Sequence, residues 1–397
     1  MLEATGMPLR SAPPNQHQKP VILQVLPALQ TGGVERGTVE MARAIVAAGG
    51  TALVASAGGR LVAELERAGA IHLRLGLMTK DPLTILLNAG RLAKLIRRHG
   101  VDLVHARSRA PAWSALLAAR RTGVPFVTTW HGVYSENFPF KRRYNAVMAS
   151  GDRVIAISQF VADRISGQYR VGPDRLRVIP RGADAAVFDP AIVRGDRIHA
   201  LARGWELPDG ARVIMLPGRL TAWKGQALLL QALAALRGAP DWVCVMVGPS
   251  GSGRDTFGAS LVQQAARLGL TANLRFAGAC GDMPAAFALA DVVVIPSLKP
   301  EPFGRTIVEA QAMERVVLAS AHGAALETVE HGVSGFHVPP GDAQALARAI
   351  EHALALDHDA RSAIGAAARA SVLERFTARR MQDATLAVYA ELLAGRA

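Results

Sequence analysis

Short apolar runs and longer amphipathic stretches alternate along the chain. Short apolar runs predict buried strands, and stretches in which apolar residues recur every three or four positions predict helices. In the first half, the predicted strands are Val21–Leu26, Thr51–Ser56, Val101–Ala106, Pro125–Trp130 and Arg153–Ile157. The predicted helices are Val34–Ala48, Leu61–Ala68, Leu83–Arg98 and Pro111–Arg121. This alternation is typical of a parallel, doubly wound sheet.

A second series of the same plan follows Arg181. Its predicted strands are Ala211–Leu216, Trp242–Val247, Leu274–Ala277, Val292–Pro296 and Val316–Ser320. Its predicted helices are Gly225–Leu236, Gly258–Leu268, Met283–Ala290, Thr306–Met313 and Ala343–Ala355. The stretch Arg181–Ile198 has turn residues and broken periodicity, which indicates a linker, and Arg361–Leu393 is predicted to be a helical tail.

The pattern therefore divides the 397 residues into two α/β domains. We expect a flexible leader over residues 1–19, one Rossmann-like domain over 20–185, a second over 186–375, and a helix over 376–397 that returns to the first domain. No apolar run reaches the roughly 18 residues that a membrane-spanning helix needs.

The positive charge of the chain is confined to its first half. Residues 1–180 hold 24 Lys and Arg against 11 Asp and Glu, whereas residues 181–397 hold 21 of each, so the first half carries the whole net charge of +13. A bias of the genome towards Arg codons would account for part of the excess. The other interpretation is an anionic partner, either nucleic acid, a phosphorylated glycolipid or an anionic membrane surface. No basic stripe interleaved with aromatic residues occurs, so nucleic acid is not expected.

Few residues suggest a metal or a disulfide. Cys244 and Cys280 are the only cysteines, and two isolated cysteines fit a reducing cytoplasm. The only Asp-x-Asp sequence, Asp357-His358-Asp359, falls between helical stretches of the tail, where a solvated loop is the expected structure. We therefore predict no metal and no cofactor.

The most specific motif follows the predicted strand Val292–Pro296. A loop with two prolines carries Glu301, and Phe303-Gly304 then leads into a helix that holds Glu309. The first amides of a helix attract anions such as a diphosphate, and a glycine lets the backbone approach a ligand closely. Two carboxylates eight positions apart can contact two parts of one ligand.

A second motif, Gly218-Arg219 followed by Lys224-Gly225, lies between a predicted strand and a predicted helix. Arg offers a planar fork of donors and Lys a point charge, and together they suit a diphosphate.

These two motifs resemble those of the retaining glycosyltransferases of family 4, which have the two-domain GT-B fold with a cleft between the domains. The resemblance covers nearly all of residues 20–392. It implies that Glu301 contacts the donor sugar and that Glu309 binds the ribose hydroxyls. It also implies that Arg219 and Lys224 clamp the pyrophosphate. The amides of Phe303, Gly304 and Arg305 would hold sugar hydroxyls and phosphate.

Further candidates lie in the first half. The resemblance implies that Gly32 and Gly33, in the turn Gln30–Gly33, approach the donor phosphates and the acceptor, although a simple tight turn is the alternative. His131 follows a predicted strand and is similar to the family's histidine beside the reacting sugar, with a catalytic role through hydrogen bonding or charge stabilisation. Arg107 and Arg109 follow another strand and are candidates for binding an anionic acceptor.

The resemblance implies transfer of a hexose from a UDP- or GDP-linked sugar, with retention and without metal. The basic first half, which is the acceptor-binding half in this fold, indicates an anionic glycolipid or polysaccharide acceptor in cell-envelope synthesis. A lipopolysaccharide core or a polyprenyl-diphosphate-linked sugar fits this charge, as expected of a transferase of the lipopolysaccharide or exopolysaccharide type. We expect a cytoplasmic location, with peripheral contact at the inner face of the membrane. A nucleotide-sugar 2-epimerase and a non-catalytic sugar-nucleotide binder are the alternatives. Glu314, Val316 and Ala324 depart from the family pattern, which leaves details of the donor pocket open.

Overall fold

The computed structural model describes residues 19–30, 32–134, 139–237, 239–249 and 256–395. The expected leader over residues 1–19 therefore lies outside the described residues, apart from Lys19, and so does Thr31. The chain forms two compact units. Residues 1–128, 150–153 and 386–397 belong to unit 1, and residues 129–149 and 154–385 belong to unit 2.

The first sheet has seven strands in the order β3-β2-β1-β4-β5-β6-β7. The strands are β1 (Val21–Val25), β2 (Thr51–Ser56), β3 (Ile71–Arg74), β4 (Leu103–Ala106), β5 (Phe126–Trp130), β6 (Arg153–Ala156) and β7 (Leu176–Val178). β1 pairs in parallel with both β2 and β4, so the winding direction changes between β1 and β4. This is the doubly wound order, and ligands of such sheets bind beyond the carboxyl ends of the strands at this point.

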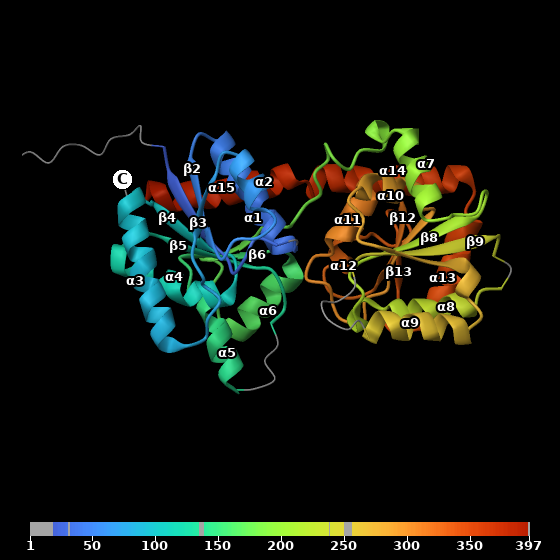
Figure 1. The fold of residues 1–397 in the computed structure, drawn as a ribbon, viewed down its shortest axis with the longest axis horizontal. Coiled ribbons are helices and arrows are strands. Elements are labelled where there is room, and N and C mark those ends of the chain that lie inside the picture. The colour runs from blue at the N-terminus through green and yellow to red at the C-terminus, as the bar shows by residue number, and fades with distance from the viewer. Residues whose placement is uncertain (1–18, 31, 135–138, 238, 250–255, 396–397) are drawn as a thin grey trace, which may run out of the picture. The chain divides into compact units, whose positions relative to one another are not determined.

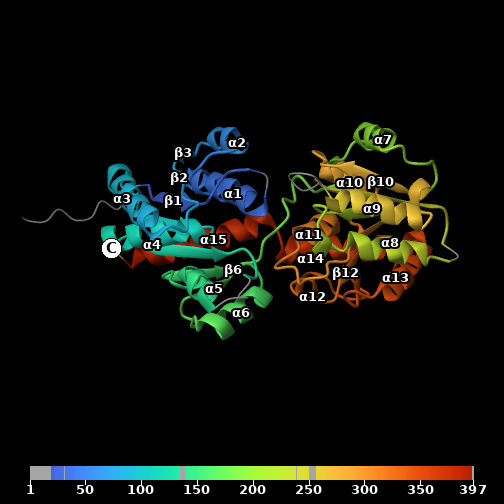
Figure 2. The same cartoon turned by 60° about the horizontal axis from the view of Figure 1, so that its bottom comes forward.

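The helices of the first half are α1 (Gly33–Ala47), α2 (Val62–Arg67), α3 (Pro82–His99), α4 (Arg109–Thr122), α5 (Pro139–Asn145) and α6 (Gln159–Tyr169). α3 shows how local sequence sets their bounds. The Asp81 carboxylate accepts a bond from the Thr84 amide at 2.7 Å, Pro82 opens the helix, and Gly100 ends it in the left-handed conformation. α3 and α4 pack side by side in unit 1, as Figure 2 shows.

The second sheet repeats the same winding with six strands, in the order β10-β9-β8-β11-β12-β13. They are β8 (Arg212–Pro217), β9 (Trp242–Val247), β10 (Leu274–Gly278), β11 (Val292–Ile295), β12 (Val316–Ser320) and β13 (Phe336–Val338). Its switch point lies between β8 and β11, which pair in parallel. The prediction of two Rossmann-like parallel sheets is confirmed.

Helices cover both faces of the second sheet (Figure 1). They are α7 (Gly195–Gly204), α8 (Gln226–Ala234), α9 (Thr256–Arg267), α10 (Met283–Leu289), α11 (Arg305–Ala312), α12 (Ala325–Thr328), α13 (Ala343–Ala355) and α14 (His358–Arg375). Alternate strand residues such as Ile214, Met246 and Leu318 pack with α8, α9 and α13 in one buried cluster. The intervening residues are buried as well, which explains why these strands read as unbroken apolar runs.

Two expectations about the connections were wrong. The stretch predicted as a linker to Ile198 already contains the start of α7 at Gly195. The helical tail is broken at Phe376-Thr377 between α14 and α15 (Ala378–Ala394). At that break, the Ala183 amide donates to the Phe376 carbonyl at 2.9 Å, and the Ala378 amide donates to the Ala183 carbonyl at 2.7 Å. At this break, hydrogen bonds to the backbone of Ala183 therefore take the place of hydrogen bonds within the helix.

None of the helices in the described part of the chain combines the length and the apolar character needed to cross a membrane.

Candidate active site

The predicted donor-binding residues of unit 2 lie in the segments that follow β8 and β11, at the switch point of the second sheet. Gly218 and Arg219 directly follow β8, and the loop from Pro296 to Gly304 follows β11 and leads into α11. The Leu298 amide donates to the Trp223 carbonyl at 2.7 Å, which joins the two loops through their backbones. Because neighbouring parallel strands end at the same edge, residues distant in sequence meet here.

An ion pair forms the centre of this site. Lys224 Nζ lies 2.6 Å from Glu301 Oε1, and Ser297 Oγ donates to the same oxygen at 2.6 Å. Only 16% of the Lys224 side chain and 7% of the Glu301 side chain are exposed. No described residue is hydrogen-bonded to Oε2 of Glu301, so that oxygen is able to accept a bond from a ligand hydroxyl.

Two glycines allow the backbones around the pair to touch. Gly225 has φ +79°, and a β-carbon added there would lie 2.0 Å from the Pro296 carbonyl oxygen. Gly323 has φ +62°, and its added β-carbon would lie 2.6 Å from the Glu301 carbonyl oxygen. Glu301 and Gly323 form an isolated parallel bridge, and the Ala324 amide donates to the Glu301 carbonyl at 3.0 Å. Larger residues would move the loop that carries Glu301.

Arg219 presents its side chain to solvent. The Gln226 side-chain amide donates to the Arg219 carbonyl at 2.9 Å and holds the backbone at this point. No described residue forms an ion pair with the Arg219 guanidinium. The site therefore holds the exposed cation of Arg219 and the largely buried, ion-paired cation of Lys224, and such a pair suits an anion with several oxygens.

The start of α11 holds the remaining predicted donor residues. Gly304 caps the helix with φ +82°, and the Phe303 ring is buried against Phe376 at 5.9 Å between ring centroids. Phe303 thus has a packing role for its side chain, while its amide lies beside the helix start. Arg305 and Glu309 form an ion pair at 3.2 Å along α11.

His131, which follows β5, also lies in unit 2. Arg181 Nη1 donates to His131 Nδ1 at 3.3 Å, and Arg181 is buried. Because arginine has no acceptor, Nδ1 accepts and the ring proton is on Nε2. The adjacent Gly132 contacts the Glu301 loop, since a β-carbon added to Gly132 would lie 3.8 Å from Pro302 Cγ.

The other predicted residues belong to unit 1. Gly32 and Gly33 are exposed at the start of α1, and the Glu35 carboxylate lies over Gly32. Arg109 opens α4. Arg107 is only 3% exposed, and burial lowers the pKa of its guanidinium, with the Tyr389 hydroxyl and Glu40 opposing that shift.

Sequence reasoning gave no role to Ser297, Arg181 or Gly323, which hold Glu301 and His131. Ser297 lies four residues before Glu301, and this spacing was a usable signal. Arg181 and Gly323 carry no local signal, because their contacts arise from the tertiary fold.

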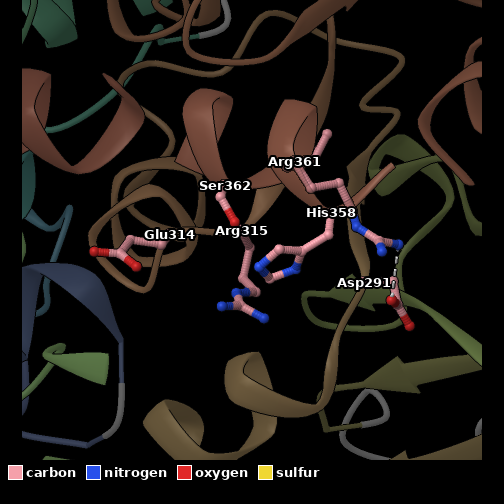
Figure 3. Close-up of a pocket in the computed structure, with 7 residues that line it drawn as sticks. Asp291, Glu314, Arg315, His358, Arg361 and Ser362 are labelled. Carbon is pink, nitrogen blue, oxygen red and sulfur yellow. Dashed lines mark hydrogen bonds and ion pairs between the residues drawn. The ribbon is translucent and has the colours of Figure 1, made fainter. Parts of the chain in front are cut away.

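A separate pocket of about 270 Å³ lies at the opposite edge of the second sheet (Figure 3). Asp291 and Arg315 directly precede β11 and β12, and Arg361 of α14 pairs with Asp291 at 3.4 Å. Arg315 donates to the Met313 carbonyl at 2.8 Å, and burial lowers the pKa of its guanidinium. These charges serve the packing of the sheet edge.

Two of the sequence departures lie at that edge. Glu314 has φ +58°, the left-handed region that favours glycine, and Val316 begins β12. Glu314 precedes β12 and Val316 is its first residue, whereas Glu301 follows β11, so neither residue lies at the strand end that carries the Glu301 loop. The third departure, Ala324, contacts that loop through its backbone amide.

Within the described ranges, no group of three or more His, Cys, Asp and Glu side chains is arranged to hold a metal ion. Asp357 of the Asp-x-Asp sequence caps α14, where its carboxylate accepts from the Ala360 amide at 2.8 Å.

Two protein-family models match the chain. Residues 31–187 match the model described as Glycosyltransferase Family 4, and residues 199–371 match that of Glycosyl transferases group 1. Among curated proteins, the D-inositol 3-phosphate glycosyltransferase of Salinispora arenicola is 33% identical over 362 residues, which cover 83% of this chain and 80% of that protein.

Solved structures are also similar to this chain. A glycosyltransferase from Rickettsia africae is 38% identical, with a TM-score of 0.89 over 95% of this chain and 99% of that chain. Alr3699/HepE of Anabaena, in complex with UDP and glucose, is 28% identical, with a TM-score of 0.82 over 94% of this chain and 99% of that chain. The same Anabaena protein has also been crystallised with UDP-glucose.

Proposed function

The chain belongs to family 4 of the glycosyltransferases, and we propose that it moves a hexose from a UDP- or GDP-linked sugar to a glycolipid or polysaccharide acceptor in cell-envelope synthesis. The observation that carries the proposal is the Lys224–Glu301 pair at the switch point of the second sheet. The complexes of the Anabaena relative with UDP and UDP-glucose support a nucleotide-sugar donor.

The proposed donor contacts follow from the charges of the site. Arg219 and Lys224 bind the diphosphate and neutralise the charge that develops on it as the bond to the sugar breaks. Glu301 Oε2 accepts from a hydroxyl of the donor sugar. Glu309 binds the ribose hydroxyls, and the amides of Phe303, Gly304 and Arg305 bind phosphate or sugar oxygens. The resemblance to family 4 adds Gly32 and Gly33 to the proposed donor contacts.

The proposed transfer proceeds with retention and without a metal ion. The acceptor hydroxyl attacks the anomeric carbon from the side of the departing diphosphate, and its proton passes to a diphosphate oxygen. His131 stabilises the sugar through a hydrogen bond from Nε2. No second carboxylate is needed as a nucleophile in this mechanism, unlike the pair of carboxylates used by retaining glycosidases. Activity that is unchanged by a chelator is the expected sign of metal independence.

A thermal-shift screen tests the donor. Wild-type protein would be heated with UDP, GDP and their glucose, N-acetylglucosamine, galactose and mannose conjugates. A true donor at one hundred times its dissociation constant stabilises the folded state by about 2.7 kcal/mol. We expect one nucleotide to raise the melting temperature. We expect Glu301→Gln to weaken the binding of its sugar conjugate more than the binding of the free nucleotide. No shift with any of these ligands would contradict the proposal.

We also propose that the acceptor is anionic and is reached at an anionic membrane surface. The net charge of +13 in residues 1–180 supports this. The start of α3 supports it further, because Met78, Leu83 and Leu87 are 77%, 71% and 62% exposed and Lys80 and Arg91 lie beside them. Apolar side chains next to cations suit the headgroup region of a bilayer.

Vesicle sedimentation tests the membrane contact. The protein should bind vesicles with phosphatidylglycerol more strongly than pure phosphatidylcholine vesicles, and added salt should weaken that binding. Leu83→Ser with Leu87→Ser should weaken it as well. A matched change of exposed leucines in unit 2, Leu298→Ser with Leu326→Ser, should not. Equal binding to both vesicle types would contradict a membrane role.

Two other functions make different predictions. A nucleotide-sugar 2-epimerase would convert one sugar nucleotide into its epimer without an acceptor, which chromatography of the reaction mixture detects. A non-catalytic binder would show the thermal shift but would neither transfer the sugar nor slowly release it to water.

A further inference from the structure

His322 of unit 2 is bonded to the loop that carries Glu301. It follows β12, and its Nε2 lies 2.9 Å from the Ser297 carbonyl oxygen. Because a carbonyl oxygen only accepts hydrogen bonds, Nε2 carries a proton and donates it. Ser297 is 1% exposed, and no other described residue donates to its carbonyl. The bond from His322 therefore satisfies a buried acceptor.

Ser297 passes this constraint on to Glu301. Its hydroxyl donates to Glu301 Oε1 at 2.6 Å, four residues further along the same loop. A serine side chain has one heavy-atom torsion, and that torsion is confined to staggered rotamers, so the backbone of Ser297 sets where its hydroxyl oxygen lies. His322, Ser297 and Glu301 thus form a chain of hydrogen bonds that ends on the carboxylate.

The segment that carries this histidine is itself anchored. The Ala321 amide donates to the Val338 carbonyl of β13 at 2.8 Å. A few residues later, the Ala324 amide donates to the Glu301 carbonyl at 3.0 Å. The loop is therefore held to one fixed segment at two points, at its start through Ser297 and at its centre through the backbone of Glu301.

These bonds give the two oxygens of the Glu301 carboxylate different surroundings. Lys224 Nζ and Ser297 Oγ both lie 2.6 Å from Oε1, whereas no described residue is hydrogen-bonded to Oε2. Lys224 alone can pair with either oxygen, because an ammonium group is a point charge with rotating donors. The Ser297 hydroxyl selects one of them, since the backbone fixes its position. The direction of Oε2 therefore depends on the bond from His322.

We propose that His322 is a positioning residue for recognition of the donor sugar. It holds Ser297, Ser297 orients the Glu301 carboxylate, and Oε2 accepts from one sugar hydroxyl at a fixed place. The inference rests on the proposed contact between Glu301 and the donor sugar, and it names the residues that orient this contact. Because His322 acts through Ser297, it affects binding of the sugar and not binding of the nucleotide.

Calorimetric titration of the full-length protein tests this role. The probes are UDP with UDP-glucose, and GDP with GDP-mannose. In each pair, the ratio of the two dissociation constants measures what the sugar adds to binding. His322→Phe keeps a ring but has no donor. We expect it to reduce the sugar's contribution by about tenfold, the range for one charge-assisted hydrogen bond, and to leave the affinity for the free nucleotide unchanged.

Two further variants separate this role from general packing. His322→Gln places an amide N–H near the position of Nε2, and it should restore most of the sugar's contribution. His337→Phe is the matched control, because His337 Nε2 also donates to a backbone carbonyl of unit 2, that of Ala325, at 3.2 Å. It should leave the contribution unchanged. An equal loss in His322→Phe and His337→Phe would overturn the proposal.

A double-mutant cycle tests whether His322 acts through Ser297. Ser297→Ala should reduce the sugar's contribution as His322→Phe does. Because the two residues act in series, the double variant should lose no more than Ser297→Ala alone. Losses that multiply in the double variant would show two independent roles and would overturn the proposed chain of bonds.

A histidine-selective nitrogen-15 spectrum of the wild-type protein tests the bond directly, without a loss of function. The ring signals of His322 are those that disappear in His322→Gln. We expect them to show a proton on Nε2, as donation to the Ser297 carbonyl requires. A ring with its proton on Nδ1 alone would contradict the bond.

The outcomes distinguish this inference from the proposed function. If a nucleotide and its sugar conjugate bind and their ratio is the same in His322→Phe and in the wild type, His322 has no role in sugar binding, while the donor function stands. If neither pair of probes binds to the wild-type protein, the proposed transfer itself fails, and the positioning role fails with it.

Discussion

The two sheets wind in the same order, yet the edges at their switch points have different environments. In unit 1, His105 of β4 is fully buried, and its Nδ1 lies 2.6 Å from the Tyr389 hydroxyl of α15, while Arg107 is buried next to them. In unit 2, Arg219 is exposed, and Glu301 keeps one oxygen for a ligand. With the same topology, the edge in unit 1 is therefore buried under packed side chains, whereas the edge in unit 2 is a polar site that solvent reaches.

The comparison shows that strand order determines where the edge at the switch point lies. It does not determine which side chains are accessible to a ligand there. At the first edge, α15 supplies the partner of His105, and burial lowers the pKa of His105 well below its usual range, with nearby Arg107 adding to the shift. Burial likewise raises the pKa of Tyr389, so both groups stay neutral. At the second edge, the cations meet solvent and a carboxylate, and they remain available to an anionic ligand.

The largest expected effect is on catalysis at the second edge. Arg219→Ala should lower turnover by about a hundredfold or more, because it removes a preorganised donor to the leaving diphosphate. The melting temperature should hardly change, since the side chain is exposed. Steady-state kinetics of sugar transfer or of donor hydrolysis measure the effect, with Arg203→Gln as a control. Near-normal turnover of Arg219→Ala would show that Arg219 does not bind the leaving diphosphate.

The next largest expected effect is on the stability of the protein. It concerns the close backbone contact between Gly225 and Pro296 in unit 2. Gly225→Ala should destabilise the protein by about 3 kcal/mol, because it combines left-handed strain with a clash against the Pro296 carbonyl. Gly210→Ala is the matched control, since Gly210 also has positive φ (+75°) but has no atom within 4 Å of the added β-carbon. The midpoints of urea unfolding measure both changes. Equal shifts for the two variants would rule out the close contact.

A pH effect of intermediate size is expected at the first edge. The pKa of His105 is lower in the folded state than in the unfolded chain, so the unfolded state binds a proton first as the pH falls. Stability is therefore fully present above about pH 6.5 and declines below it, at up to about 1.4 kcal/mol per pH unit.

His105→Phe should flatten this decline, which unfolding midpoints between pH 7 and pH 5 would reveal. The pKa of His72 is also lowered by burial, so part of the slope should remain in the variant. An unchanged slope after His105→Phe would show that His105 is not the residue responsible.

The smallest expected effect is at the surface of unit 1. Arg153 Nη2 and Glu391 Oε1 lie 2.6 Å apart, with 22% and 39% of their side chains exposed. Glu391→Gln should cost less than about 1 kcal/mol, and the cost should shrink with added salt, because solvent screens such pairs. Thermal unfolding at low and high salt measures it, and a large salt-independent loss would contradict the assignment.

The sequence predicted most of the interior of both sheets. The strands Thr51–Ser56 and Trp242–Val247 have the predicted bounds, because each is a continuous buried run. The short edge strands β3 and β7 were not predicted, since their partly exposed residues give no apolar run. α7 was missed because none of its residues is buried.

The sequence by itself determined the two α/β halves and the residue types at the carboxyl ends of β8 and β11, since both follow from local patterns. Only the tertiary structure decided that Lys224 reaches Glu301, 77 positions further along the chain, and that Arg107 is buried in unit 1. The physical reason is that side-chain environment depends on strand order and on which segments pack over an edge. Those contacts join residues far apart in sequence, so no local pattern records them.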